Sequence, residues 1–86
     1  MKKKIGILGS TGSIGENTTN IIKKNKDDFD VIFLSTNTNV KKLLKQASIL
    51  KPHSVIIFDK QNYSKYRKKF IIKKIKVFNS FKELKK

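Results

Sequence analysis

The stretch that decides the fold is Ile7-Leu8-Gly9-Ser10-Thr11-Gly12-Ser13-Ile14-Gly15, in which glycine recurs at every third position from residue 9. The run before it, from Lys4 to Leu8, is short and apolar and predicts a buried strand. A helix is expected to begin near Ser13, because Ile14 and Ile21 lie two helical turns apart. The stretch therefore joins a strand to a helix through a glycine-rich turn.

Strands and helices keep alternating along the rest of the chain. The segment from Val31 to Ser35 is rich in β-branched and aromatic residues and predicts a second strand, after a turn from Asp27 to Asp30. Apolar residues at helical spacing predict a helix that follows Asn39 as its N-cap and ends before Pro52. The remaining expected elements are a strand at 54–58, a helix at 59–70, a strand at 76–78 and a short helix at 81–84.

This alternation predicts one small α/β domain. Strands that alternate with helices of about ten residues pair in parallel through right-handed crossovers. We therefore expect a Rossmann-like βαβαβ(αβ) parallel sheet with helices on both faces. A chain of 86 residues is expected to begin such a sheet without completing it, because short chains bury little surface.

Each glycine of the turn has a separate physical task. Gly9 lets the chain leave the strand in a backbone conformation that other residues avoid. Gly12 leaves room for the backbone to approach a pyrophosphate, and Gly15 lets the helix pack closely on the strand. The first N–H groups of the helix then face the phosphates at the positive end of the helix dipole. The pattern predicts a dinucleotide site, and a tight turn without a ligand is the alternative.

The end of the second strand bears on which dinucleotide is bound. NAD-binding units usually carry Asp or Glu there, which holds the ribose hydroxyls. No acidic residue stands between Ser35 and Asn37, and Asp30 precedes the strand. A polar loop followed by Lys41 and Lys42 suits a 2′-phosphate better. The sequence therefore favours NADP over NAD, and a capped loop without a ligand-binding role is the alternative.

The chain is strongly basic. It has 21 Lys and Arg against 6 Asp and Glu, a formal net charge of +15, and no cysteine, which excludes disulfides and thiolate metal sites. The lysines are spread along the chain and Arg67 is the only arginine, so compositional drift explains the charge better than a nucleic-acid partner. No segment suits a membrane span or a signal peptide, and a cytoplasmic location is expected.

Two other functions stay open as alternatives. A basic nucleic-acid binder would need cationic groups and stacking rings on one face, and segment 63–70 offers Tyr63, Tyr66 and Phe70 among three lysines and an arginine. The helical spacing of these rings fits core packing better, so nucleic acid is an unlikely partner. A stand-alone nucleotide-binding module would need a partner to cover its open sheet edge.

The string from Gly9 to Gly15 at the end of an N-terminal strand is also quite specific to one family. Together with Asn39-Val40, Leu43-Leu44, Gln46-Ala47 and Pro52, it resembles the N-terminus of 1-deoxy-D-xylulose 5-phosphate reductoisomerases. The likeness covers residues 3–58 well and the remainder loosely. The resemblance implies an NADPH-binding segment of an enzyme that converts 1-deoxy-D-xylulose 5-phosphate to 2-C-methyl-D-erythritol 4-phosphate in non-mevalonate isoprenoid biosynthesis.

The resemblance also implies which residues would bind the cofactor. In the family, the glycine turn and the loop after the second strand hold NADPH. That loop usually has glycine, a basic residue and asparagine, so Asn37 and Thr38 depart from the pattern, and Lys41 or Lys42 is the expected substitute for the basic residue. The predicted cofactor-binding residues are Thr11, Gly12, Ser13, Ile14, Asn37, Thr38 and Asn39.

Family members are several times longer than this chain, so residues 1–86 are expected to be the N-terminal part of an NADP-binding domain. The resemblance places the catalytic domain and the metal-binding residues beyond position 86, and it implies Mg²⁺ or Mn²⁺ only in the full-length enzyme. We therefore predict no catalytic or metal-ligating residue here, and an inactive chain. The family also implies a homodimer. His53 is expected to be a loop residue, because a lone histidine forms neither a metal site nor a catalytic triad.

Overall fold

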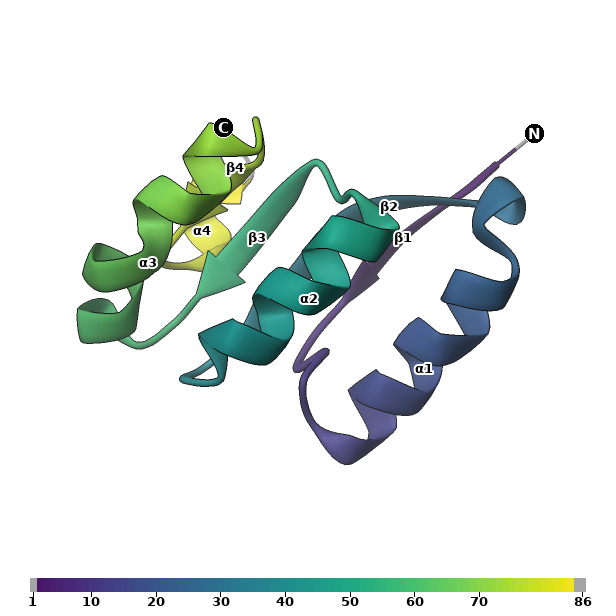
Figure 1. The fold of residues 1–86 in the computed structure, drawn as a ribbon, viewed down its shortest axis with the longest axis horizontal. Helices are drawn as coiled ribbons and strands as arrows, with labels where there is room; N and C mark the ends of the chain where they lie inside the picture. Colours follow the sequence, from purple (N-terminus) through teal and green to yellow (C-terminus); the bar gives the residue numbers. More distant parts are fainter. Residues whose placement is uncertain (1, 85–86) are drawn as a thin grey trace.

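Four parallel strands form a single sheet in the order β1-β2-β3-β4 in the computed structural model of the chain, which describes residues 2–84 (Figure 1). Helices connect successive strands, as the alternation predicts. The elements are β1 (Lys3–Ile7), α1 (Ser13–Lys24), the 3₁₀ helix η1 (Lys26–Asp28), β2 (Phe29–Thr36), α2 (Val40–Leu50), β3 (Ser54–Ile57), α3 (Lys60–Ile72), β4 (Lys76–Phe78) and α4 (Phe81–Leu84).

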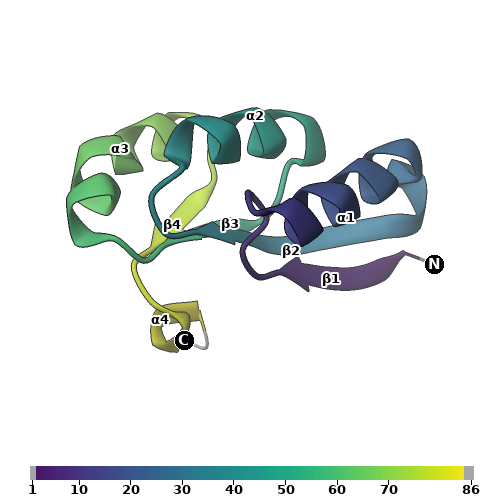
Figure 2. The same cartoon turned by 90° about the horizontal axis from the view of Figure 1, so that it is seen from below.

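Three helices cover one face of the sheet. Figure 2 shows α1, α2 and α3 on one side and α4 on the other. Each long helix links two neighbouring parallel strands in the same direction along the sheet, so right-handed crossovers place all three on the same side. The prediction of a parallel α/β sheet with helices on both faces is confirmed, and in the described chain the short α4 is what lies on the second face.

The core lies between the sheet and the three long helices. Leu34 and Val55 from the central strands meet Leu43 of α2 and Phe70 of α3, and all four side chains are fully buried. The predicted cap of α2 is confirmed, because the Asn39 Oδ1 accepts a hydrogen bond from the backbone N–H of residue 42 at 3.3 Å. This core fixes α2 against β2, and the two elements together support the glycine turn.

Strand β2 begins earlier than the sequence predicts. The sequence predicts that Phe29 and Asp30 lie in a turn, but both belong to the strand and pair with Lys3 and Lys4 of β1. The polar Asp30 is tolerated there because it lies at the sheet margin, where its Oδ1 is 3.0 Å from the Nε2 of His53. The predicted loop position of His53 is confirmed, since it lies in the bend before β3.

A β-bulge at Ile32 changes which side chains of β2 face the core. The register between β1 and β2 shifts by one residue at this point, so Ile32 has no partner in β1. Val31 and Leu34 both enter the core as a result, whereas Phe33 pairs with Gly6. A Cβ atom on Gly6 would lie 2.0 Å from the Phe33 ring, so the bulge and the glycine fit together.

Aromatic rings attach α4 to the second face of the sheet. Phe81 meets Phe33 edge-on at a centroid distance of 5.4 Å and Phe58 at 5.8 Å. Within the described residues, no helix has the length and apolar character that crossing a membrane requires.

The N-cap of α3 should make stability depend on pH. Asp59 Oδ2 accepts hydrogen bonds from the backbone N–H of Asn62 at 2.9 Å and from its side-chain amide at 2.7 Å. These two bonds, the backbone one first, lower the pKa of Asp59 below its ordinary 3.8. A lowered pKa contributes stability that is complete above pH 3.8 and is lost as pH falls through the folded-state value.

We therefore expect the Asp59→Asn variant to melt below the wild type at pH 6, and the gap to close on acidification below the ordinary carboxyl pKa. Thermal melts between pH 6 and pH 2 measure this. Asp27→Asn removes the same charge from an exposed residue and is the control. A gap that widens in acid would contradict the assignment.

Candidate functional site

The glycine turn lies at the carboxyl end of β1, which is where open parallel sheets bind ligands. Gly9 has a φ of +62°, which confirms the task predicted for it. The N–H of Gly12 donates to the carbonyl of Gly9 at 3.0 Å and closes the turn. The N–H of Glu16 then donates to the carbonyl of Gly12 at 2.7 Å and starts α1. The turn thus delivers the chain directly into the helix.

The other two glycines serve different purposes. A Cβ atom on Gly15 would lie 2.1 Å from the carbonyl oxygen of Gly9 and 2.7 Å from the Cα of Ser10. Only a glycine lets α1 approach this closely. The sequence predicts a close approach to the strand, and the backbone that α1 meets at Gly15 is that of the turn directly after the strand. A Cβ atom on Gly12 would meet one neighbour, the same Gly9 oxygen, at an ordinary 3.5 Å. Protein packing therefore does not require glycine at position 12, and the predicted approach of a ligand gives a reason for it.

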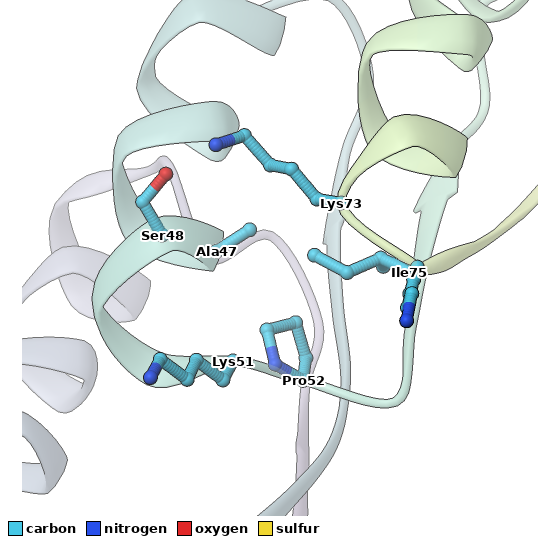
Figure 3. A pocket seen from close by; sticks show the side chains of 7 residues that line it. Ala47, Ser48, Lys51, Pro52, Lys73 and Ile75 are labelled. Carbon is cyan, nitrogen blue, oxygen red and sulfur yellow. The ribbon is translucent and has the colours of Figure 1, made fainter.

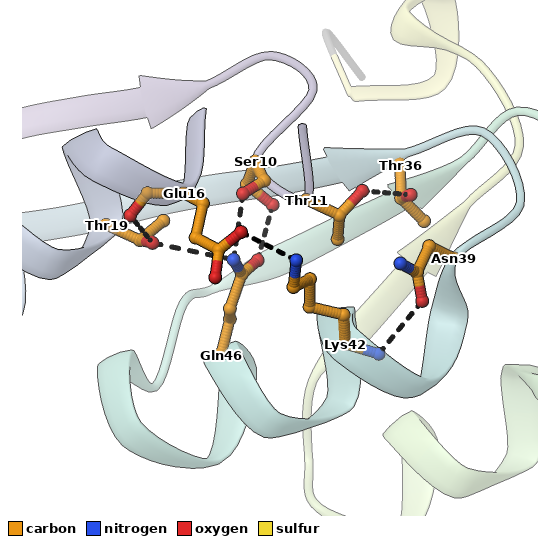
Figure 4. A network of polar contacts seen from close by, with 8 residues as sticks. All are labelled: Ser10, Thr11, Glu16, Thr19, Thr36, Asn39, Lys42 and Gln46. Atoms are coloured by element: carbon orange, nitrogen blue, oxygen red, sulfur yellow. Dashed lines mark hydrogen bonds and ion pairs between the residues drawn. The ribbon is translucent and has the colours of Figure 1, made fainter. Parts of the chain in front are cut away.

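Hydrogen bonds attach the glycine turn to strand β2. The N–H of Gly9 donates to the Ser35 Oγ at 2.8 Å, and the N–H of Ser10 donates to the Ser35 carbonyl at 2.9 Å. The hydroxyls of Thr11 and Thr36 lie 2.7 Å apart (Figure 4). The hydroxyl of Thr11, one of the predicted cofactor-binding residues, thus contacts β2, and either hydroxyl of the pair can be the donor. The backbone N–H of Thr11 is the second group that this residue offers a ligand.

Helix α2 also contacts the turn, through the side chain of Gln46. Gln46 contacts both the hydroxyl and the carbonyl of Ser10, and it also reaches Thr19 of α1. Figure 4 shows these side chains meeting between α1, α2 and the turn. No motif in the sequence predicts a role for Ser10, Ser35, Thr36 or Gln46. For Gln46 the sequence does contain an indication of a role, because this polar residue lies three residues after Leu43 on the face of α2 that is otherwise apolar.

The start of α1 is open to solvent. Gly12, Ser13 and Ile14 are exposed, and no side chain caps this helix terminus. The first N–H groups of an α-helix have no partner within the helix, so this terminus presents unpaired donors at the positive end of the dipole. Next to it is a hollow of about 520 Å³, lined by Ile7, Leu8, Gly9, Gly12, Ser13, Ile14, Gly15 and Thr18. The arrangement suits an anion on the helix terminus and an apolar group beside it.

The loop after β2 lies next to this turn, through the contact of Thr36 with Thr11. Asn37 and Thr38 are exposed, and their carbonyls accept hydrogen bonds from the N–H groups of residues 59 and 40. The side chain of Asn39 is occupied in capping α2. Of the three predicted loop residues, Asn37 and Thr38 thus present their side chains to solvent, and Asn39 shapes the loop.

The two lysines expected to replace the missing basic residue differ in their surroundings. Lys41 is exposed, whereas the Nζ of Lys42 lies 2.6 Å from Glu16 Oε2. This ion pair links the first turns of α1 and α2. Because both side chains are more than a third exposed, water screens the pair and its contribution to stability is about 0–1 kcal/mol.

A second hollow, of about 420 Å³, lies at the opposite end of the strands from the glycine turn (Figure 3). It separates the C-terminal ends of α2 and α3, next to the amino ends of β3 and β4. Ligands of open parallel sheets bind at the carboxyl ends of the strands, so this hollow is not part of the candidate ligand site at the glycine turn. Its lining residues are Ala47, Ser48, Lys51, Pro52, Lys73, Lys74 and Ile75.

The aromatic residues considered for nucleic-acid stacking pack toward the core. Phe70 is fully buried, and Tyr63 and Tyr66 are half-buried against the core cluster. The Nζ atoms of Lys65 and Lys69 each lie 5.3 Å from the Tyr66 ring centroid. Among residues 2–84, no three His, Cys, Asp or Glu side chains gather into a potential metal site.

The fold and the turn define a Rossmann-like α/β protein with a glycine-rich βα turn at the carboxyl edge of its sheet. Residues 5–85 match the family model described as 1-deoxy-D-xylulose 5-phosphate reductoisomerase. The chain belongs to this family, and the resemblance noted in the sequence is confirmed.

Relatives with that name share much of the chain. The protein from Porphyromonas gingivalis (strain W83) is 52% identical over 63 residues, which are 73% of this chain and 16% of the relative. The protein from Pelagibacter ubique (strain HTCC1062) is 42% identical over 84 residues, which are 98% of this chain and 22% of the relative. The chain therefore spans about a fifth of the length of these relatives.

Solved structures agree with the sequence match. The reductoisomerase from Zymomonas mobilis in complex with NADPH superposes with a TM-score of 0.85 at 29% identity, over 91% of this chain and 21% of that one. A reductoisomerase structure in complex with magnesium gives a TM-score of 0.75 at 27% identity, over 91% of this chain and 19% of that one. The likeness thus covers about nine-tenths of this chain and about a fifth of each larger protein.

The contrast between the glycines gives a stability prediction. We expect Gly15→Ala to lower the free energy of unfolding by about 1–3 kcal/mol, because its methyl group would overlap backbone atoms that cannot move aside freely. Gly12→Ala, in the same turn, should change stability much less. Urea unfolding midpoints compare the two variants, and equal losses would show that the close approach at Gly15 is not required.

Proposed function

We propose that the turn from Gly9 to Gly15 binds the pyrophosphate of NADPH, and that residues 1–86 form the N-terminal part of the NADP-binding domain of a 1-deoxy-D-xylulose 5-phosphate reductoisomerase. The observation that carries the proposal is the uncapped start of α1 beside Gly12, a glycine that packing within the protein does not require. The complex of the Zymomonas mobilis relative with NADPH supports the choice of cofactor.

The residues present fit this role in three parts. The N–H groups at the start of α1 would hold the pyrophosphate, and Gly12 would let it approach the backbone. The apolar hollow formed by Leu8 and Ile14 would take an uncharged part of the dinucleotide. The loop of residues 37–39, with Lys41 and Lys42, would face the 2′-phosphate. When bound, NADPH supplies a hydride for the reduction.

We further propose that the whole protein converts 1-deoxy-D-xylulose 5-phosphate to 2-C-methyl-D-erythritol 4-phosphate. The family match over residues 5–85 supports this reaction. The metal ion of that reaction is assigned to the full-length enzyme, consistent with the solved relative in complex with magnesium. The homodimer and the cytoplasmic location expected from the sequence stay predictions.

A thermal melt with cofactor tests the binding site. A ligand at a hundredfold excess over its Kd that binds only the folded state stabilises it by about 2.7 kcal/mol, which raises the Tm of a domain this small by roughly 10 °C or more. We expect this shift with NADPH and a smaller one with NADH. Gly12→Ala should melt near the wild-type temperature without cofactor and lose most of the shift. A cooperative melt that neither cofactor moves would exclude the proposed site.

The choice between NADPH and NADH has its own test. A hydrogen bond to a charged group contributes about 1.5–3 kcal/mol, so replacing the exposed Lys41 by alanine should reduce the preference for NADPH roughly tenfold or more. Calorimetric Kd values for both cofactors measure the preference. Lys65→Ala, on the distant α3, removes the same charge and controls for the overall field. A preference that drops equally in the Lys65 variant would show that net charge alone selects the phosphate.

A further inference from the structure

Gln46 is a polar side chain in an apolar setting. It belongs to the face of α2 that carries Leu43 and Ala47 into the core, and it is only 9% exposed. An amide in such a place needs partners for its oxygen and its nitrogen, because a buried polar group without a hydrogen bond is destabilising. The contacts of Gln46 therefore show which part of the structure this position serves.

Both ends of the amide contact Ser10. The Oε1 accepts a hydrogen bond from the Ser10 hydroxyl at 2.8 Å, and the Nε2 donates to the Ser10 carbonyl at 2.8 Å. Because a carbonyl can only accept, this contact fixes which end of the amide faces the backbone. Ser10 is fully buried, so water does not compete for these bonds.

The same amide also reaches α1. The Nε2 lies 3.4 Å from the Oγ1 of Thr19, which itself donates to the carbonyl of Glu16 at 2.8 Å. Gln46 thus links the glycine turn to the first turns of the helix whose terminus is the proposed phosphate site. Strand β2 holds the N–H side of Ser10 through the Ser35 carbonyl, and Gln46 holds the opposite, carbonyl side.

Because the peptide bond is planar, the bond from Gln46 to the Ser10 carbonyl also sets the direction of the next N–H group. The carbonyl of Ser10 and the N–H of Thr11 belong to one trans peptide unit and point in opposite directions. A carbonyl held by Gln46 on α2 therefore directs the N–H of Thr11 away from α2. Besides its hydroxyl, which lies 2.7 Å from that of Thr36, this N–H is the group that Thr11, a predicted cofactor-binding residue, offers a ligand.

We propose that Gln46 is a positioning residue for the cofactor, which fixes the peptide unit between Ser10 and Thr11 in its ligand-binding orientation without touching the ligand. The proposal rests on the proposed function of the turn in binding a dinucleotide phosphate. Its structural half, the ordering of the turn by Gln46, stands apart from that function and can be measured without cofactor.

The test replaces Gln46 with methionine, which has a similar length but lacks the amide. We expect Gln46→Met to raise the Kd for NADPH about tenfold. Without cofactor, hydrogen exchange should accelerate at the N–H groups of Ser10 and Gly12, which donate to the carbonyls of Ser35 and Gly9, and stay unchanged at Phe58. Val77→Ala, in β4 and away from the turn, is the control for lost stability, and it should leave both readouts unchanged.

The outcomes separate the two claims. If Gln46→Met melts lower but keeps the wild-type Kd and wild-type exchange at Ser10 and Gly12, Gln46 is only a packing residue and the inference is wrong. If the wild type shows no NADPH binding while exchange in the turn still accelerates in the variant, the ordering of the turn by Gln46 stands, and the proposed function fails together with the role toward the cofactor. Should Gln46→Met not fold, Ser10→Ala removes one of the two contacts and must give the same changes at smaller size; its failure to do so would also overturn the inference.

Discussion

The pairing of the Ser10 backbone on both sides is the interaction on which the rest of the structure depends. Ser10 is fully buried where the glycine turn meets α2 and β2, so its N–H and its carbonyl are removed from water and must find partners in the protein. Ser35 supplies the acceptor for the N–H, and Gln46 supplies the donor for the carbonyl. Ser10 can therefore be buried while Gly12, Ser13 and Ile14, at the start of α1, stay exposed to solvent.

Much of this arrangement follows from sequence patterns, and the exceptions have physical reasons. The glycine spacing predicted the strand, the turn and the start of α1, because steric limits on the backbone act locally. The bulge at Ile32 and the early start of β2 depend on which residues of β1 lie opposite, which no local pattern contains. The hydrogen bonds between Gln46 and Ser10 join residues 36 positions apart. The place of Gln46 on an apolar helix face is therefore the one indication of them in the sequence.

The exposed apolar residues beside the turn follow from the strand order. Dinucleotides bind where the order of strands reverses, which requires a strand on each side of the first one. Here β1 lies at the edge of the described sheet and pairs with β2 alone. Leu8, Ile14 and Ile21 are 62%, 84% and 60% exposed, respectively, and two of them line the hollow at the turn. Such a surface is expected of one half of a cofactor crevice.

The charge of the chain is a poor guide to its site. Glu16, in the first turn of α1, would repel a phosphate at that terminus, but Lys42 lies against it and the two charges offset each other. The attraction for an anion at the turn therefore rests on oriented backbone N–H groups. Their directions are set by the glycines and by the hydrogen bonds of Ser10 to Ser35 and Gln46. The net charge of +15 adds a field over the whole molecule that brings phosphates near, while the backbone geometry decides where one binds.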